Sequence, residues 1–209
     1  MKKLIALLLA LVMVMSLVAC GNKNETPENN DANNEVEQTP ENNETPENNE
    51  TPEVTGPASA LEVLETVWGK YADDEKFPTM GGDFENIVDN APGAYNLADE
   101  GLSTTLLVPA DQVANIDEAA SLVHGMMLNN FTCGAFKVAD AAAFAEAMHG
   151  AISTNPWMCG MPEKMVIATI GGEYVVALFG VNDAVNPFEA KLTAAYPAAE
   201  IVYSEAITG

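Results

Sequence analysis

The distribution of apolar and polar residues divides the chain into three parts. The first is an apolar run from Leu4 to Ala19, which only Ser16 interrupts. The second, from Gly21 to about Pro57, has almost no large apolar side chains. The third, residues 58–209, alternates apolar stretches with turn residues, and about 150 residues are enough to bury a substantial core. We therefore expect a single folded domain behind an N-terminal region of different character.

Apolar residues at helical spacing predict four main helices in this domain. The first begins at Ser59, where Glu62 completes a capping box. Its apolar face carries Leu61, Leu64, Val67, Trp68 and Tyr71. The other three are expected at residues 115–127, 140–153 and 186–197. Asp140 caps the third helix, and Pro187 takes the first helical position of the fourth. A short helix is also expected around Phe84–Val88, within a turn-rich segment.

Runs of β-branched and apolar residues predict the strands between these helices. They are expected at residues 104–108, 131–138, 165–170, 173–179 and 200–203. Gly171-Gly172 separates two of them, and two glycines allow the positive φ angles of a tight hairpin turn. The pattern therefore predicts an α+β fold, with a single mixed sheet, a C-terminal β-hairpin and helices packed on the sheet.

The N-terminal apolar run has the features of an export signal. Lys2 and Lys3 precede it, and it is shorter than the ~20 apolar residues that a spanning helix needs. Its end, Leu17-Val18-Ala19-Cys20, resembles a lipobox, the site at which lipoprotein signal peptidase cuts. The resemblance implies that residues 1–19 are a signal peptide and that Cys20 carries diacylglycerol. Its two acyl chains would anchor the protein to the outer face of the cell membrane. The alternatives are an uncut signal anchor and a plain secretory signal.

Residues 20–57 have the composition of a disordered tether. A short repeat recurs in them, first as Thr26-Pro27-Glu28-Asn29-Asn30. Such a segment cannot bury enough apolar surface to offset the entropy of folding. Its acidic residues outnumber its single lysine, Lys23, so that the segment repels itself and extends.

The charge of the chain restricts its partners. The formal net charge is −23, and the sequence contains no arginine. Without guanidinium groups the chain lacks the bidentate donors that favour phosphate, and like charge repels nucleic acid and anionic headgroups. Cationic peptides, metal ions and neutral ligands remain as partners. The other interpretation is that acidity only keeps an exported protein soluble.

No catalytic motif is present. The sequence lacks Gly-x-Ser-x-Gly, His-Glu-x-x-His, Ser-x-x-Lys, a Walker loop and Gly-x-Gly-x-x-Gly. Several acidic residues crowd one turn-rich segment, which is compatible either with a calcium loop or with a solvated surface. They are Asp73, Asp74, Glu75, Asp83, Glu85 and Asp89.

Four local features of the domain together suggest a family resemblance. They are the Met126-Met127 pair ahead of a strand, the strand end Phe136–Val138, an alanine-rich helix, and the glycine-turn hairpin around Gly171–Val176. In these features the stretch Thr104–Lys191 resembles a family of uncharacterised lipoprotein domains from Gram-positive bacteria. The resemblance implies no particular activity. Some relatives are labelled bacteriocin transport accessory proteins, a name that suggests a thioredoxin-like protein, but this chain has no Cys-x-x-Cys.

Soft metal ligands are concentrated in one part of the domain. They are His124, Met126, Met127, Cys133, His149, Met158, Cys159 and Met161. The predicted strand continues past Cys133 at ~3.3 Å per residue, and the predicted helix returns at 1.5 Å per residue. The two elements therefore span similar distances. We therefore expect Cys133 and Cys159 to be neighbours at one end of the sheet.

Three interpretations of these residues are open. Export to an oxidising space and an even count of remaining cysteines favour a disulfide between Cys133 and Cys159. The second interpretation is inert packing, with methionine as core filler. The third is a copper(I) site, because thiolate, thioether and imidazole are its preferred ligands.

These observations favour a non-enzymatic lipoprotein that acts as a binding or accessory module, without a cofactor and without a nucleic-acid partner. The alternative is a soft-metal (copper) or thiol-redox protein that uses Cys133 and Cys159. A third hypothesis, an envelope enzyme, has no residue to support it. An aromatic-lined cleft with Trp68 or Trp157 would favour ligand binding, although core packing is the ordinary expectation for both.

Overall fold

A computed structural model of the chain describes residues 56–208. The predicted signal peptide, most of the tether and the lipidation site Cys20 lie outside the described residues. The elements in chain order are α1 (Ala60–Trp68), β1 (Thr79–Gly81), β2 (Val88–Asp89), β3 (Gly93–Tyr95), α2 (Gly101–Thr104), η1 (Val113–Asn115), β4 (Ile116–His124), η2 (Leu128–Asn130), β5 (Phe131–Val138), α3 (Ala141–Ser153), β6 (Lys164–Ile170), β7 (Tyr174–Gly180), α4 (Asn182–Ala195) and β8 (Ala199–Ala206). None of the helices among the described residues has the length and apolarity to cross a membrane.

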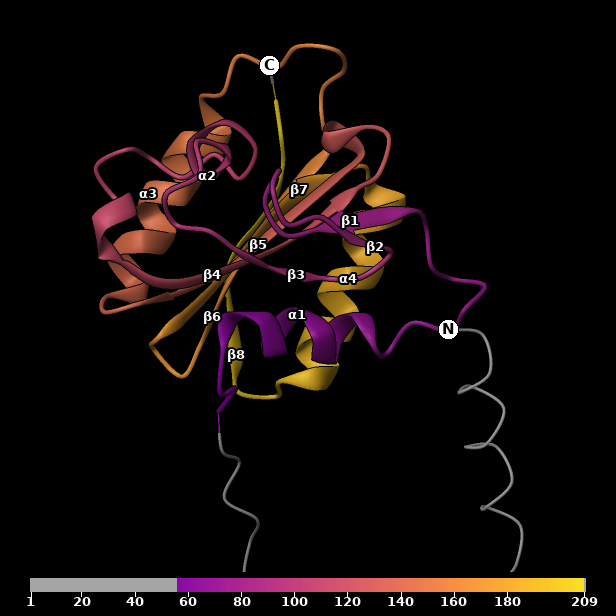
Figure 1. The fold of residues 1–209 in the computed structure, drawn as a ribbon, viewed down its shortest axis with the longest axis horizontal. Coiled ribbons are helices and arrows are strands. Elements are labelled where there is room, and N and C mark those ends of the chain that lie inside the picture. Colours follow the sequence, from indigo (N-terminus) through magenta and orange to yellow (C-terminus); the bar gives the residue numbers. More distant parts are fainter. Residues whose placement is uncertain (1–55, 209) are drawn as a thin grey trace, which may run out of the picture. The chain divides into compact units, whose positions relative to one another are not determined.

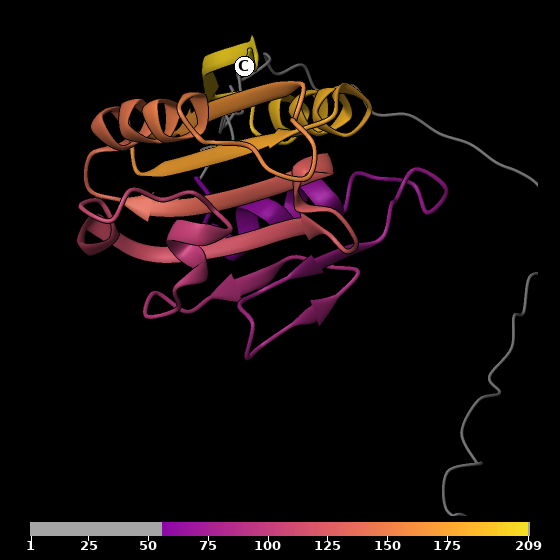
Figure 2. The same cartoon turned by 90° about the horizontal axis from the view of Figure 1, so that it is seen from above.

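One eight-stranded sheet forms the centre of the domain. Its strands follow the order β2-β1-β4-β5-β7-β6-β8, and β3 also pairs with β4. Figure 2 shows the strands side by side, from yellow β8 at the top to the magenta and indigo strands at the bottom. The α+β class, the single sheet and the C-terminal hairpin are confirmed. Every strand pairing among residues 56–208 is antiparallel, so the expectation of a mixed sheet was wrong.

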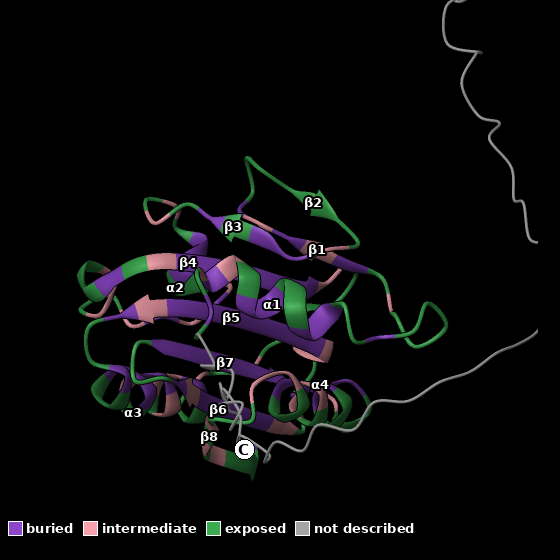
Figure 3. Ribbon diagram, turned by 90° about the horizontal axis from the view of Figure 1, so that it is seen from below, coloured by how far each residue is buried: buried purple, intermediate pink, exposed green. Residues whose placement is uncertain are grey.

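Both faces of the sheet are covered. α1 and α4 pack on one face, while α3 and the segment containing α2 pack on the other (Figure 1). Alternate side chains of each central strand therefore enter different cores. On β5, for example, Cys133 and Ala135 face α1 and α4, whereas Phe136 and Val138 face α3. Figure 3 shows these central strands in purple and the short edge strand β2 in green.

Local sequence signals account for the ends of several elements. The Ser59 hydroxyl accepts from the Glu62 backbone N–H at 3.0 Å, and Asp140 Oδ1 accepts from the Ala143 N–H at 3.0 Å. Such caps satisfy helix donors that have no intrahelical partner. The hairpin turn between β6 and β7 uses Gly171 and Gly172 at φ 62° and 77°, a conformation that side chains with a Cβ rarely adopt. The predicted N-caps and glycine turn are thus confirmed, although the Glu62 side chain accepts from the Ala58 N–H at 2.8 Å rather than from that of Ser59.

The predicted helix at residues 115–127 is wrong. This stretch forms strand β4 in the middle of the sheet, between β1 and β5. Its residues from Ala119 to Val123 are all buried, because both faces of the strand are covered. A central strand of this kind is continuously apolar, so hydrophobic periodicity cannot distinguish it from a buried helix.

Three further predictions about elements are wrong. Residues 104–108 form no strand: α2 ends at Thr104, and Leu107 at φ 57° breaks the extended conformation while Leu106 and Val108 are buried. The expected helix at residues 84–88 is absent, because residues 84–87 form a loop and Val88 begins β2. The last helix begins at Asn182, not at residue 186, because Ala184 and Val185 are buried on the sheet and extend it by a turn before Pro187.

Candidate functional site

Most of the exposed large apolar side chains come from three segments of the domain. Within residues 56–208, eight of the nine exposed large hydrophobic side chains come from the segments 84–88, 126–128 and 158–161. They are Phe84, Ile87, Val88, Met126, Met127, Leu128, Met158 and Met161. The ninth, Val202, lies on the edge strand β8. Two neighbouring hollows share Leu128 and connect these segments.

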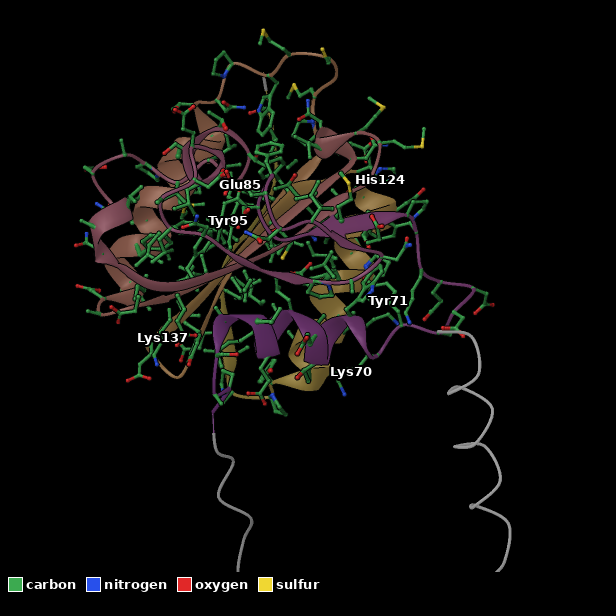
Figure 4. The ribbon with its side chains drawn as sticks, viewed as in Figure 1. Lys70, Tyr71, Glu85, Tyr95, His124 and Lys137 are labelled. Atoms are coloured by element: carbon green, nitrogen blue, oxygen red, sulfur yellow. The ribbon has the colours of Figure 1, made fainter. Side chains whose placement is uncertain are left out.

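The first hollow, which we call the methionine hollow, has a volume of about 270 Å³. It is lined by Met126, Met127, Leu128, Asn129, Met158 and Cys159. Its two sides come from the β4–β5 connection and from the loop between α3 and β6. Figure 4 labels His124 at the end of β4, and most of the yellow sulfur atoms lie at the top of the view on the same side of the domain. The sequence had placed this loop at this end of the sheet, and that expectation is confirmed.

Asn129 holds the two sides of the methionine hollow together. Its side-chain amide donates to the carbonyl oxygen of Met158 at 2.8 Å and to that of Gly160 at 2.6 Å. The backbone of the loop is therefore fixed against the β4–β5 connection, although the side chains that it carries are exposed. Cys159 has φ 63°, in the left-handed region that non-glycine residues seldom adopt.

The β4–β5 connection is itself fixed at both ends. His124 Nδ1 accepts hydrogen bonds from the backbone N–H groups of Met126 at 3.2 Å and Met127 at 3.3 Å. At the other end, the Val181 N–H donates to the Asn130 carbonyl at 3.0 Å. These bonds hold the short loop that carries Met126 and Met127, whose side chains are exposed.

Trp157 closes the loop against the core. Its ring packs on Phe179 at a centroid distance of 5.0 Å. The indole nitrogen Nε1 is buried and has no hydrogen-bond partner among the described residues. Trp68 instead lies in the core and donates from Nε1 to the Asn90 carbonyl at 3.1 Å. Neither tryptophan lines the methionine hollow or its two neighbouring hollows. The two tryptophans therefore do not form the aromatic-lined cleft that would have favoured ligand binding.

The second hollow, the Phe84 hollow, lies beside the first and has a volume of about 60 Å³. Its lining is mostly apolar and includes Phe84, Ile87, Tyr95, Val123 and Leu128. Ser121 is buried in this lining and donates to the Gly82 carbonyl at 2.9 Å. Burial and the neighbouring Asp99 raise the pKa of Tyr95 to about 12, so that its hydroxyl stays neutral.

Asp83 organises the loop that carries Phe84 and Ile87. The carboxylate is buried and accepts from the Asn86 side chain and from the backbone N–H groups of Glu85, Asn86 and Asn96, at 2.9–3.2 Å. Burial alone would raise the pKa of Asp83, but these hydrogen bonds outweigh it and hold the pKa below its usual value. The acidic segment around Asp83 therefore owes its shape to hydrogen bonds within itself.

A third hollow, the His124 hollow, has a volume of about 240 Å³. It is lined by Phe77, His124, Asn130, Val181, Asp183 and Ala184. Phe77 stacks on the His124 ring at a centroid distance of 5.7 Å. Within residues 56–208, no lysine lines any of the three hollows, whereas Asp83 and Asp183 do.

The disulfide between Cys133 and Cys159, one of the three interpretations of the sequence, is not present in the structure. Cys133 and Cys159 are both free thiols. Cys133 is completely buried on the face of the sheet that α1 and α4 cover, and burial raises the pKa of its thiol well above the usual range. Cys159 is exposed in the loop before β6. The lengths of the strand and the helix correctly predicted that the loop with Cys159 lies at the end of the sheet where β5 begins. The Cys133 side chain, however, points from β5 into the core.

The predicted ligand cluster is brought together only in part. Met126, Met127, Met158 and Cys159 share the methionine hollow, and Met161 is exposed on the same loop. His149 is not among them, because its ring stacks on Tyr203 at 4.0 Å and its Nε2 lies 2.8 Å from Glu205 Oε1. Among the described residues, no three His, Cys, Asp or Glu side chains are grouped so as to hold a metal ion.

Sequence reasoning missed the residues that connect and extend the hollow. Phe84, Ile87, Leu128 and Asn129 were not singled out. Two signals could have pointed to them: apolar residues in a segment otherwise rich in acids, and an asparagine next to a methionine pair. Their role depends on long-range contacts, such as that of Asn129 with Gly160, which spacing along the chain does not encode.

Comparison of the chain with family models, curated proteins and solved structures finds no match.

Proposed function

We propose that the chain is a lipid-anchored extracytoplasmic lipoprotein whose domain is a non-enzymatic binding module. Its contact surface would be the combined rim of the methionine hollow and the Phe84 hollow. The lipobox pattern at Cys20 supports the location. The observation that carries the binding role is that six exposed large apolar side chains line these two adjoining hollows, namely Phe84, Ile87, Met126, Met127, Leu128 and Met158.

Exposure of this kind is unusual for side chains that serve only to pack. Phe84 is 69% exposed, Met126 82% and Met158 79%, whereas the core methionines Met148 and Met165 are each 1% exposed. Apolar groups gathered on a surface cost free energy in water and commonly mark contact sites. Methionine suits such a site because its flexible side chain adapts to different partners.

Charge favours a cationic partner. The apolar rim belongs to a chain of formal net charge −23. Four lysines form ion pairs with carboxylates away from the rim, namely Lys76, Lys137, Lys164 and Lys191. Asp83 lines the Phe84 hollow, and no lysine lines either hollow of the proposed surface. An amphipathic segment with apolar and positively charged faces would complement this surface.

A direct test is the binding of a labelled amphipathic peptide of leucine and lysine. The soluble mature chain, residues 20–209 with Cys20→Ala, is titrated against the peptide, and fluorescence anisotropy gives the Kd. The double variant Phe84→Ser/Leu128→Ser should weaken binding at least about 10-fold, because each change removes ~1 kcal/mol of apolar contact.

Val202→Ser is the matched control, since Val202 is an exposed apolar residue remote in the chain from all three apolar segments. It should leave the Kd unchanged. A peptide of the same composition with scrambled order should bind weakly. Equal affinity of the wild-type chain, the double variant and the control would show that attraction is only electrostatic and would reject the proposed surface.

A further inference from the structure

We propose that the methionine hollow is a copper(I) site, in which the Cys159 thiolate and the thioether sulfurs of Met126, Met127 and Met158 bind one ion. This inference rests on the sulfur content of the hollow rather than on its apolarity. It therefore goes beyond the proposed partner binding, and it stands or falls separately.

Four sulfur-bearing side chains from two distant segments line this one hollow. Met126 and Met127 come from the β4–β5 connection, and Met158 and Cys159 come from the loop before β6. Thiolate and thioether are soft ligands, which select copper(I) over hard cations. The same donor set is poorly suited to zinc or calcium, and no group of three His, Cys, Asp or Glu side chains within residues 56–208 offers an alternative.

The backbone of this hollow is fixed while its ligands remain free to turn. The Asn129 amide joins the two loops through the carbonyls of Met158 and Gly160. Met126 and Met158 are mostly exposed, so that their long side chains can rotate toward an ion without disturbing the core. The two loops are therefore already held together in the unbound protein, which reduces the conformational entropy that is lost when the ion binds.

The two cysteines differ in what they can contribute. Cys133 is fully buried and its thiol has a raised pKa, which excludes it as an accessible ligand. Cys159 is exposed in the hollow. On binding, the S–H bond of Cys159 breaks, its proton passes to water, and a copper–sulfur bond forms. The copper stays in the +1 state throughout, so no electron is transferred.

The test is an anaerobic titration of the soluble mature chain with copper(I), in competition with bicinchoninate and with ascorbate present to keep the metal reduced. We expect one ion per chain. The variant Met126→Leu/Met158→Leu should weaken binding at least about 10-fold, because leucine keeps the apolar volume but removes the thioether. Met148→Leu, at a buried position, is the matched control and should bind as the wild-type chain does.

Two results would overturn the inference. One is equal copper affinity for the wild-type chain and the triple variant Met126→Leu/Met158→Leu/Cys159→Ser. The other is loss of copper on Cys133→Ala with Cys159→Ser unaffected. Circular dichroism melts verify that each variant folds. Phe84→Ser changes no sulfur ligand, so it should weaken binding of the leucine–lysine peptide and still bind copper(I) as the wild-type chain does. This pair of results separates the inference from the proposed function.

Discussion

At the scale of single residues, chemistry depends on the direction in which a side chain points. The two cysteines illustrate this. Cys133 belongs to a central strand and faces the α1–α4 core, whereas Cys159 lies in an exposed loop. The same residue type is therefore inert in one place and available as a ligand in the other.

Asp83 provides a test of stability at this scale. Asp83→Asn should lower the free energy of unfolding at pH 7 by about 2–3 kcal/mol, because a buried charged acceptor of several hydrogen bonds is lost. Chemical denaturation at a series of pH values measures the effect. The folded pKa lies below the unfolded value of ~3.9, so the stabilisation is present above about pH 4 and is lost as the pH falls through the folded pKa.

Glu85→Gln is the matched control, since Glu85 is an exposed carboxylate two residues away. It removes the same charge and should change stability little. A constant difference between the wild-type chain and Asp83→Asn down to pH 2 would contradict the assigned role of the ionised carboxylate.

At the scale of elements, sequence patterns predicted those structures whose signals are local. The caps at Ser59 and Asp140 and the turn at Gly171-Gly172 act within a few residues, and each was found as expected. Strand β4 was missed because its burial depends on what covers both of its faces, which is a tertiary property. The joining of the two loops by Asn129 was missed for the same reason.

Asn129→Ala tests how the elements of the site are joined. We expect faster amide hydrogen exchange across residues 158–161, because two hydrogen bonds from the side chain are lost. The loss in overall stability should be about 1–2 kcal/mol. Asn115→Ala is the control, since the Asn115 side chain also makes an exposed hydrogen bond, to Gln112. Unchanged exchange at residues 158–161 would show that Asn129 does not hold the loop.

At the scale of the whole molecule, the described domain combines a closed core with one open apolar end. Both sheet faces are covered, so binding has to use the loops at the ends of the strands rather than a sheet face. A long acidic segment separates these loops from the predicted anchor at Cys20. The proposed location of the domain outside the membrane depends on that anchor.

The most direct test is the intact mass of the chain extracted from bacterial membranes, together with that of Cys20→Ala. The account predicts a wild-type chain that begins at Cys20, without residues 1–19, and carries a diacylglycerol adduct. Cys20→Ala should retain residues 1–19 and lack the adduct, because the signal peptidase requires the lipidated cysteine. A wild-type chain that keeps its N-terminus, or that is cut without a lipid adduct and released from the membrane, would contradict the account.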